Sequence, residues 1–161
     1  MKKIIIASLI LLSATAFAQS NSTNPPFSFG GYIETYYSCD FGKPSNHNRP
    51  GFIYSHNRHN EVSLNLGLVK AAYQTEKLRA NFTLMAGTYP NANLSAEPGV
   101  LKNIYEASAG FKISKNKNIW LDAGVLSSHI GFESAIGKDN WTLTRSLNAE
   151  NTPYFETGAK I

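Results

Sequence analysis

The chain of 161 residues contains one cysteine, Cys39, and after its first 18 positions it has no apolar run of about 20 residues. A single cysteine excludes an internal disulfide framework. The lack of a long apolar run excludes a helical membrane protein, so a membrane could be crossed only by strands. The formal net charge is +4, of which Lys2 and Lys3 supply two, and we therefore expect no nucleic-acid partner.

The start of the chain has the pattern of a secretory signal peptide. Two lysines precede the apolar run Ile4 to Leu12, and small residues follow it. A charged start, a short apolar centre and a small-residue end are typical of exported proteins. We predict a signal peptide over residues 1–18, cleaved after Ala18. Residues 19–26, rich in Ser, Asn and Pro, are predicted to be a flexible lead-in.

From Phe27 onward, apolar and polar residues alternate with the period of two that is typical of β-strands. The predicted strands run over residues 27–39, 61–74, 79–87, 105–113, 119–128 and 153–161. Their connections are alternately long and short, as in antiparallel transmembrane β-barrels. The predicted fold of residues 27–161 is therefore all-β, with about six strands of an up-and-down outer-membrane β-barrel.

The connection lengths predict an orientation. The long connections are residues 40–60, 89–102 and 129–152, and the short turns are residues 75–77 and 114–118. Outer-membrane barrels have short periplasmic turns and long outer loops. We therefore expect both short turns and the mature N-terminus to face the periplasm. The connection over residues 89–102 is expected to contain a helical turn.

The charged residues favour a membrane barrel over a soluble β-sandwich. In the regular stretches they lie only on the polar face of each strand, while the other face is rich in alanine. Lipid tolerates such a face, whereas a packed sandwich core would be thinly filled by it. We predict that the polar face lines a lumen. The candidate lumen residues are Glu34, Glu61, Arg79, Glu106, Lys112, Asp122, Glu156 and Lys160.

The alternation is interrupted in the second strand. Leu64, Leu66 and Leu68 are predicted to share the apolar face, but the same period then places Lys70 on that face. We expect either a β-bulge at Lys70 or a lysine side chain that reaches the membrane interface.

No catalytic, cofactor or metal site is predicted. Ser128 and His129 are neighbours, and neighbouring strand residues point to opposite faces, so they cannot act together as nucleophile and base. A serine of another strand as the partner of His129 is left open. His47, His56 and His59 could suggest a metal site, but they lie in a stretch without a helix signal, and we expect a solvated loop.

The third long connection contains Trp141 and Arg145. If this loop folds inward, both residues could contribute to a constriction of the lumen. A surface loop packed on its own tryptophan is the alternative.

Several sequence motifs resemble a known family. They are Glu97 to Ala107, Ser128 to Ile136, Trp141 to Ser146, and Glu150 to Tyr154. They resemble the OmpL-like β-barrel porins of Gram-negative outer membranes, and the resemblance covers the N-terminal part of a longer family pattern. It implies an outer-membrane barrel and passive transport, with no catalytic residues. Because bacterial barrels have at least about eight strands, we expect the chain to be a fragment.

These features predict a porin-like protein that is not an enzyme. It would be surrounded by outer-membrane lipids and let small polar solutes or ions diffuse passively through its lumen. A barrel that serves as a structural or adhesive surface protein is one alternative. A soluble exported β-sandwich that binds carbohydrate through tyrosine and tryptophan is the other. Homo-oligomerisation is left open, because no residue argues for it.

Overall fold

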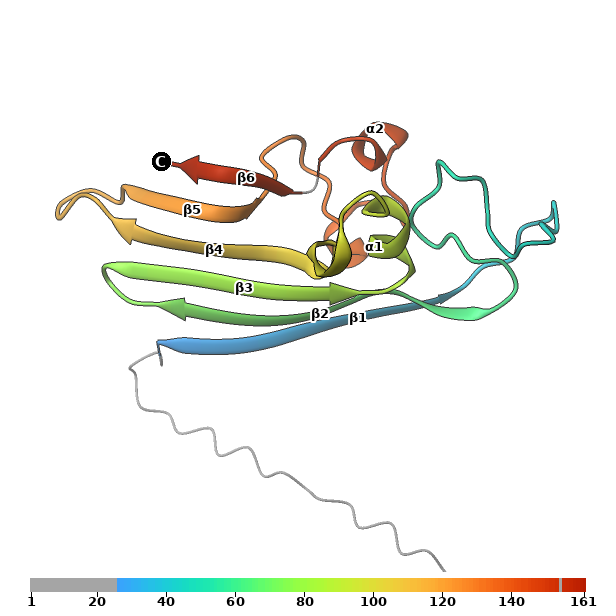
Figure 1. Cartoon of the computed structure of the whole chain (residues 1–161), viewed down its shortest axis with the longest axis horizontal. Coiled ribbons are helices and arrows are strands. Elements are labelled where there is room, and N and C mark those ends of the chain that lie inside the picture. Colours follow the sequence, from blue (N-terminus) through green and yellow to red (C-terminus); the bar gives the residue numbers. More distant parts are fainter. Residues whose placement is uncertain (1–25, 154) are drawn as a thin grey trace, which may run out of the picture.

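Six antiparallel strands form one sheet, and each strand pairs with the next along the chain (Figure 1). The computed structural model describes residues 26–153 and 155–161. The strands are β1 (Phe27–Tyr37), β2 (Val62–Gln74), β3 (Leu78–Ala86), β4 (Ile104–Lys112), β5 (Trp120–Ser127) and β6 (Phe155–Lys160). This confirms the predicted all-β, up-and-down arrangement. The predicted signal peptide and nearly all of the predicted lead-in lie outside the described residues.

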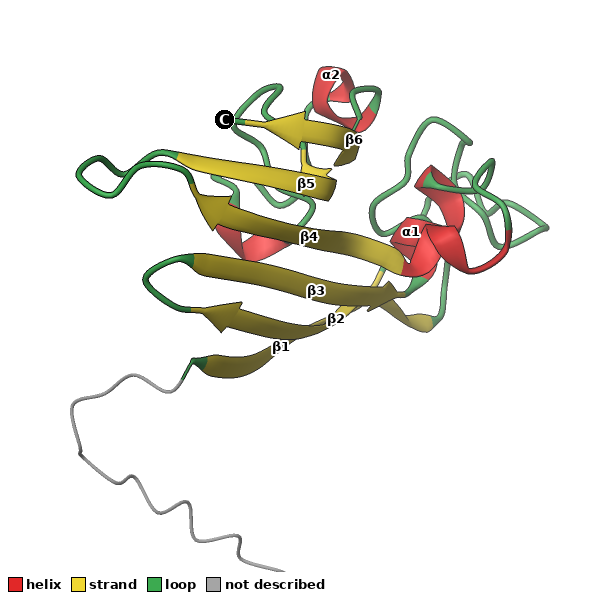
Figure 2. Ribbon diagram, turned by 60° about the vertical axis from the view of Figure 1, so that its left-hand side comes forward, coloured by secondary structure: helices red, strands yellow, loops and turns green. Residues whose placement is uncertain are grey.

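The long connections lie at one end of the sheet and the two short turns at the other (Figure 2). We call the long connections L1 (residues 38–61), L2 (residues 87–103) and L3 (residues 128–153). L2 contains α1 (Thr88–Asn93) and the 3-10 helix η1 (Gly99–Asn103), while L3 contains η2 (Gly137–Asp139) and α2 (Leu147–Glu150). The helical turn expected in L2 is therefore present. No helix in the described part of the chain is long and apolar enough to cross a membrane.

The two faces of the sheet differ in exposure. Val69 pairs with Gly31 and Leu84 across the sheet, so these residues share a face, on which Val69 is 69% exposed. We call this the outer face. Its exposed large hydrophobic residues are Phe27, Phe29, Ile33, Tyr37, Val62, Val69, Leu78, Phe82, Leu84 and Phe111.

The opposite face, which we call the inner face, is partly covered by the long connections. On it, Leu66, Leu68 and Met85 are at most 7% exposed. They form the core of the molecule together with Tyr89 of α1 and Ala135 of L3. The core therefore lies between the sheet and the loops, at the loop end of the inner face.

The bulge in β2 lies at Asn65 rather than at Lys70. Glu34 pairs with Leu66 and the next residue, Thr35, pairs with Leu64, so Asn65 is the extra residue. An extra residue reverses the face of everything beyond it. Leu66 and Leu68 consequently lie on the inner face, and the prediction that they share a face with Leu64 is wrong.

The same reversal explains the lysine that interrupted the pattern. Lys70 pairs with Thr83 of β3, which lies on the inner face. Every Asp, Glu, Lys and Arg of the six strands therefore lies on the inner face. A second register shift, between Thr83 and Leu84, leaves Tyr105 of β4 as an extra residue, and its side chain packs against the core instead of sharing the outer face.

A glycine in β5 permits a close approach between strands. Gly124 has a φ of 129°, and a Cβ there would lie 2.2 Å from the carbonyl oxygen of Ala107. Gly124→Ala should therefore destabilise the folded protein by about 1–3 kcal/mol, which a lower urea midpoint would report. Gly30→Ala is the matched control, because nothing lies within 4 Å of a Cβ at that position. Equal midpoints for the two variants would contradict the prediction.

Candidate functional site

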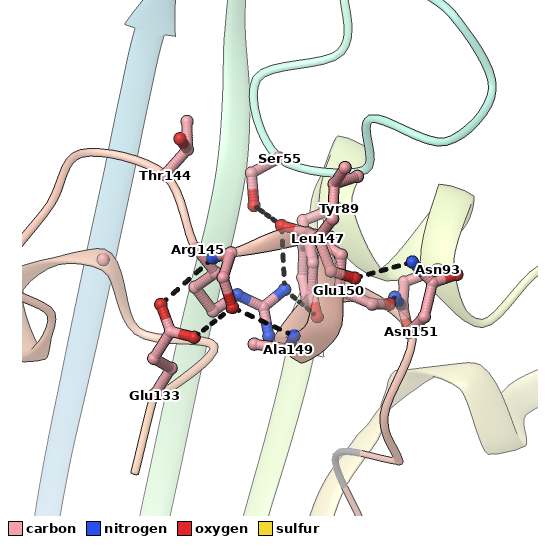
Figure 3. Close-up of polar contacts among 12 residues, drawn as sticks. Ser55, Tyr89, Asn93, Glu133, Thr144, Arg145, Leu147, Ala149, Glu150 and Asn151 are labelled. Atoms are coloured by element: carbon pink, nitrogen blue, oxygen red, sulfur yellow. Dashed lines mark hydrogen bonds and ion pairs between the residues drawn. The ribbon is translucent and has the colours of Figure 1, made fainter. Parts of the chain in front are cut away.

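L3 crosses the inner face from β5 to β1, the strand at the other edge of the sheet. The backbone N–H of Gly137 in L3 donates a hydrogen bond to Oε2 of Glu34 in β1, at 3.3 Å. Figure 3 shows Glu133, Thr144 and Arg145 of L3 in front of the first strands of the sheet. L3 therefore folds inward over this face of the sheet.

A buried ion pair within L3, together with its hydrogen bonds to L1 and L2, joins all three long connections (Figure 3). In L3, Nη2 of Arg145 lies 3.2 Å from Oε1 of Glu150, and the two side chains are 2% and 6% exposed. The same guanidinium nitrogen donates to the hydroxyl of Tyr89 in L2 at 2.7 Å. The hydroxyl of Ser55 in L1 donates to Oε1 of Glu150 at 3.0 Å. We call these four residues the loop clasp.

Local sequence positions the clasp residues. Ser146 directly follows Arg145 and begins α2 as its N-cap, since its hydroxyl accepts a hydrogen bond from the backbone N–H of Ala149 at 3.2 Å. Glu133, across the loop, accepts hydrogen bonds from the backbone N–H and the hydroxyl of Ser146, at 3.0 and 2.5 Å. These bonds lower the pKa of Glu133. The turn of helix that carries Glu150 is thus fixed at its start.

Burial sets the protonation state of the clasp tyrosine. Burial raises the pKa of the Tyr89 hydroxyl well above its usual range, and the charge of Glu150 adds to this rise, whereas Arg145 opposes it. Tyr89 is therefore a neutral phenol whose oxygen accepts the hydrogen bond from Arg145. Its ring also lies under the guanidinium, with 4.9 Å between Cζ and the ring centroid.

Glu34 is the polar centre of the inner face next to the clasp. Its Oε1 lies 2.8 Å from Nε2 of His56 and accepts from Nδ2 of Asn65, the bulge residue, at 2.9 Å. Its Oε2 accepts from the Tyr32 hydroxyl at 2.6 Å and from the N–H of Gly137. The carboxylate therefore has partners from β1, β2, L1 and L3.

A second charged group lies on the inner face near the short turns. Arg79 in β3 pairs with Asp122 in β5, and its Nε donates to Oδ1 at 2.7 Å. Gly110 of β4 lies between them in register, and a Cβ there would be 2.0 Å from Oδ1 of Asp122. Because Gly110 has no side chain, the side chains of Arg79 and Asp122 can meet across β4. The Arg79 guanidinium also lies 4.4 Å from the ring centroid of Trp120.

The other candidate lumen residues have separate partners. Lys160 is in register with Asp122, and Lys112 with Trp120. Glu106 accepts from the hydroxyl of Ser108 at 3.1 Å.

Glu61 lies just outside β2. There it accepts hydrogen bonds from Nε of Arg58 at 2.6 Å and from the Ser63 hydroxyl at 3.0 Å. These bonds lower the pKa of Glu61.

The two candidate constriction residues have different surroundings. Arg145 is buried in the loop clasp, whereas Trp141 is 99% exposed.

Glu156 binds both residues of the Ser128–His129 pair. The hydroxyl of Ser128 and Nδ1 of His129 each lie 3.1 Å from a different oxygen of the carboxylate. The carboxylate, and not the imidazole, therefore contacts the serine hydroxyl, unlike in a nucleophile and base pair.

The histidines of L1 are less exposed than we expected. His47 is exposed, but His56 and His59 are buried. His56 contacts Glu34, and Nδ1 of His59 accepts from the backbone N–H of Asp40 at 2.8 Å. The expectation of a solvated loop is wrong for these two, because His56 is held against the sheet by Glu34 and His59 by a contact within L1. Within residues 26–153 and 155–161, no group of His, Cys, Asp and Glu could hold a metal ion.

Sequence patterns did not identify Ser55, Tyr89 or Glu150. Ser55 and Glu150 are 95 positions apart, and Tyr89 and Arg145 are 56 apart. The bulge residue Asn65 did leave a signal, since the slip in alternation follows it.

A comparison with protein families supports this fold. The family model described as "putative beta-barrel porin-2, OmpL-like" matches residues 26–161. No curated protein and no solved structure matches the chain. Since the family match covers every strand and all three long connections, the chain belongs to the OmpL-like β-barrel porin family.

Proposed function

We propose that the protein forms the wall of a bacterial outer-membrane channel for passive diffusion of small polar solutes or ions, after export directed by residues 1–18. The observation that carries this proposal is the division between the two faces of the sheet. Exposed apolar side chains gather on the outer face, and all charged strand residues lie on the inner face. Lipid outside and water inside would produce this division.

L3 is the constricting element of the proposed channel. It lies across the inner face and is held at Glu34 and at the loop clasp. In this channel Arg145 fixes the position of L3, and the charged row containing Arg79, Asp122 and Lys160 lines the wider half near the short turns. The protein performs no covalent chemistry.

Ion selectivity of the full-length protein in planar bilayers tests the channel. Arg79→Gln should raise the cation-to-anion permeability ratio, because it removes a positive charge beside Asp122, and Asp122→Asn should lower it. A unit charge about 8 Å from an ion in water changes the energy of that ion by about 0.5 kcal/mol, so we expect a change of roughly two- to five-fold.

The matched control is Lys117→Gln, which removes the same charge from the exposed turn between β4 and β5. This variant should leave the permeability ratio unchanged. Unchanged ratios for both Arg79→Gln and Asp122→Asn would remove the pair from the conducting path.

A barrel that binds a partner at the cell surface is the second candidate function. It is favoured by exposed aromatic residues in the long connections, among them Phe41, Phe132 and Trp141. Liposome swelling separates the two functions, because a blocked barrel admits no solute. The soluble two-sheet sandwich does not agree with the single sheet that the described strands form.

A further inference from the structure

We infer that the Ser55–His56 segment of L1 holds L3 over the inner face, so that L1 and L3 move away from that face together. This inference rests on the proposed function only in taking L3 as the constriction, since the coupling between L1 and L3 is a property of the fold. It makes L1 the regulator of the proposed channel.

Consecutive residues of L1 hold L3 at two separate points. Ser55 donates directly to Glu150 in α2, and His56 contacts Oε1 of Glu34, whose Oε2 accepts from the N–H of Gly137 in L3. One short segment of L1 therefore supports both the helical end of L3 and the part that reaches β1.

Glu34 transmits the effect of His56 because one carboxylate serves both loops. Glu34 and His56 have side chains only 15% and 11% exposed, so water replaces a lost partner poorly. Hydrogen bonds in such a network strengthen one another. Loss of the His56 contact leaves Asn65 as the remaining partner of Oε1, so the carboxylate is held less firmly and the bond from Gly137 at Oε2 is weakened.

The position of His56 is itself fixed by the sheet. Its backbone N–H donates to Oδ1 of Asn65 at 2.9 Å, and Nδ2 of the same amide donates to Glu34. The bulge in β2 thus supplies one side chain that binds both His56 and Glu34. L1 cannot leave this point without breaking contacts to the carboxylate that holds L3.

Hydrogen exchange of the full chain in lipid nanodiscs, followed by mass spectrometry, tests the coupling. His56→Ala should raise the exchange rate of the L3 peptide containing Gly137 about ten-fold, the effect of losing one hydrogen bond to a charged group. The hydrogen bonds of His56 go to Asn65 and Glu34, so this change would reach Gly137 through Glu34. His56→Gln retains a side-chain N–H donor and should restore slow exchange.

His59→Ala is the matched control. His59 is also a buried histidine of L1, but its partner is the backbone of Asp40, within the same loop. This variant should loosen L1 around Asp40 and leave exchange at Gly137 unchanged.

Two results would overturn the inference: unchanged exchange at Gly137 in His56→Ala, or an equal rise in His56→Ala and His59→Ala. Exchange is measured without any current, so its outcome does not depend on whether the barrel conducts. If His56→Ala loosens L3 while the conductance stays that of the unaltered protein, the coupling stands and L3 is not the constriction.

Discussion

Replacing Arg145 with methionine should release L3 from the inner face and destabilise its folded position by about 3–5 kcal/mol, because one partner of a buried ion pair is lost. Glu150 would be left buried with its charge uncompensated, and Tyr89 would lose a hydrogen-bond donor. Faster hydrogen exchange in α2 and faster proteolysis within L3 would report the release. If L3 narrows the lumen, single-channel conductance should rise in the same variant.

Two further variants control this experiment. In Arg145→Met/Glu150→Gln both charges are removed, so the double variant should be less destabilised than Arg145→Met alone. Lys138→Met removes a positive charge from an exposed ion pair of the same loop, and its effect should stay below about 1 kcal/mol. If the double variant is destabilised by the sum of the effects of Arg145→Met and of Glu150→Gln measured separately, the two side chains do not form a buried pair.

Arginine in place of Val69 should destabilise the protein in lipid by about 2–4 kcal/mol, the cost of a charge on the lipid-facing side near the middle of a membrane strand. Val69 is near the centre of β2 and mostly exposed, so the change removes little packing. On a surface exposed to water the same substitution would be nearly neutral, within about 0.5 kcal/mol. The free energy of unfolding in lipid vesicles, measured by urea titration, distinguishes the two environments.

Ala72→Arg provides the comparison within the same strand. Ala72 pairs with Ser28 and Asn81 on the inner face, where the added charge would lie in the lumen. We expect a much smaller loss of stability than for Val69→Arg. If both variants lose the same stability, the assignment of the outer face to lipid is wrong.

The strands could be predicted from the sequence because alternation is a local property of the chain. No strand end lies more than two residues from its predicted position. The faces could not be predicted throughout. A period-two pattern assigns Leu66 and Lys70 by counting from Leu64, and the extra residue at Asn65 makes that count wrong by one. The slip itself was visible, but its position depends on pairing with β1.

The loop contacts were beyond sequence patterns for a different reason. Arg145 was a candidate because the third long loop could fold inward and constrict a lumen. Its partner Tyr89, and the Ser55 that completes the clasp, come from other connections and follow no period. Histidines in a loop rich in Pro and Asn were expected to be solvated, and only the folded position of L1 shows that His56 reaches Glu34.

The bulge at Asn65 also affects where along β2 a membrane would lie. The alternation of the sequence alone would place an unbroken row of apolar side chains, from Val62 to Leu68, on one face of β2. In the folded strand the outer face carries Leu64, Gly67, Val69 and Ala71. Leu66 and Leu68 lie on the inner face. In the proposed outer-membrane barrel the hydrocarbon belt would therefore be shifted along β2 toward the short turns, and hydropathy alone would position the bilayer too close to the loops.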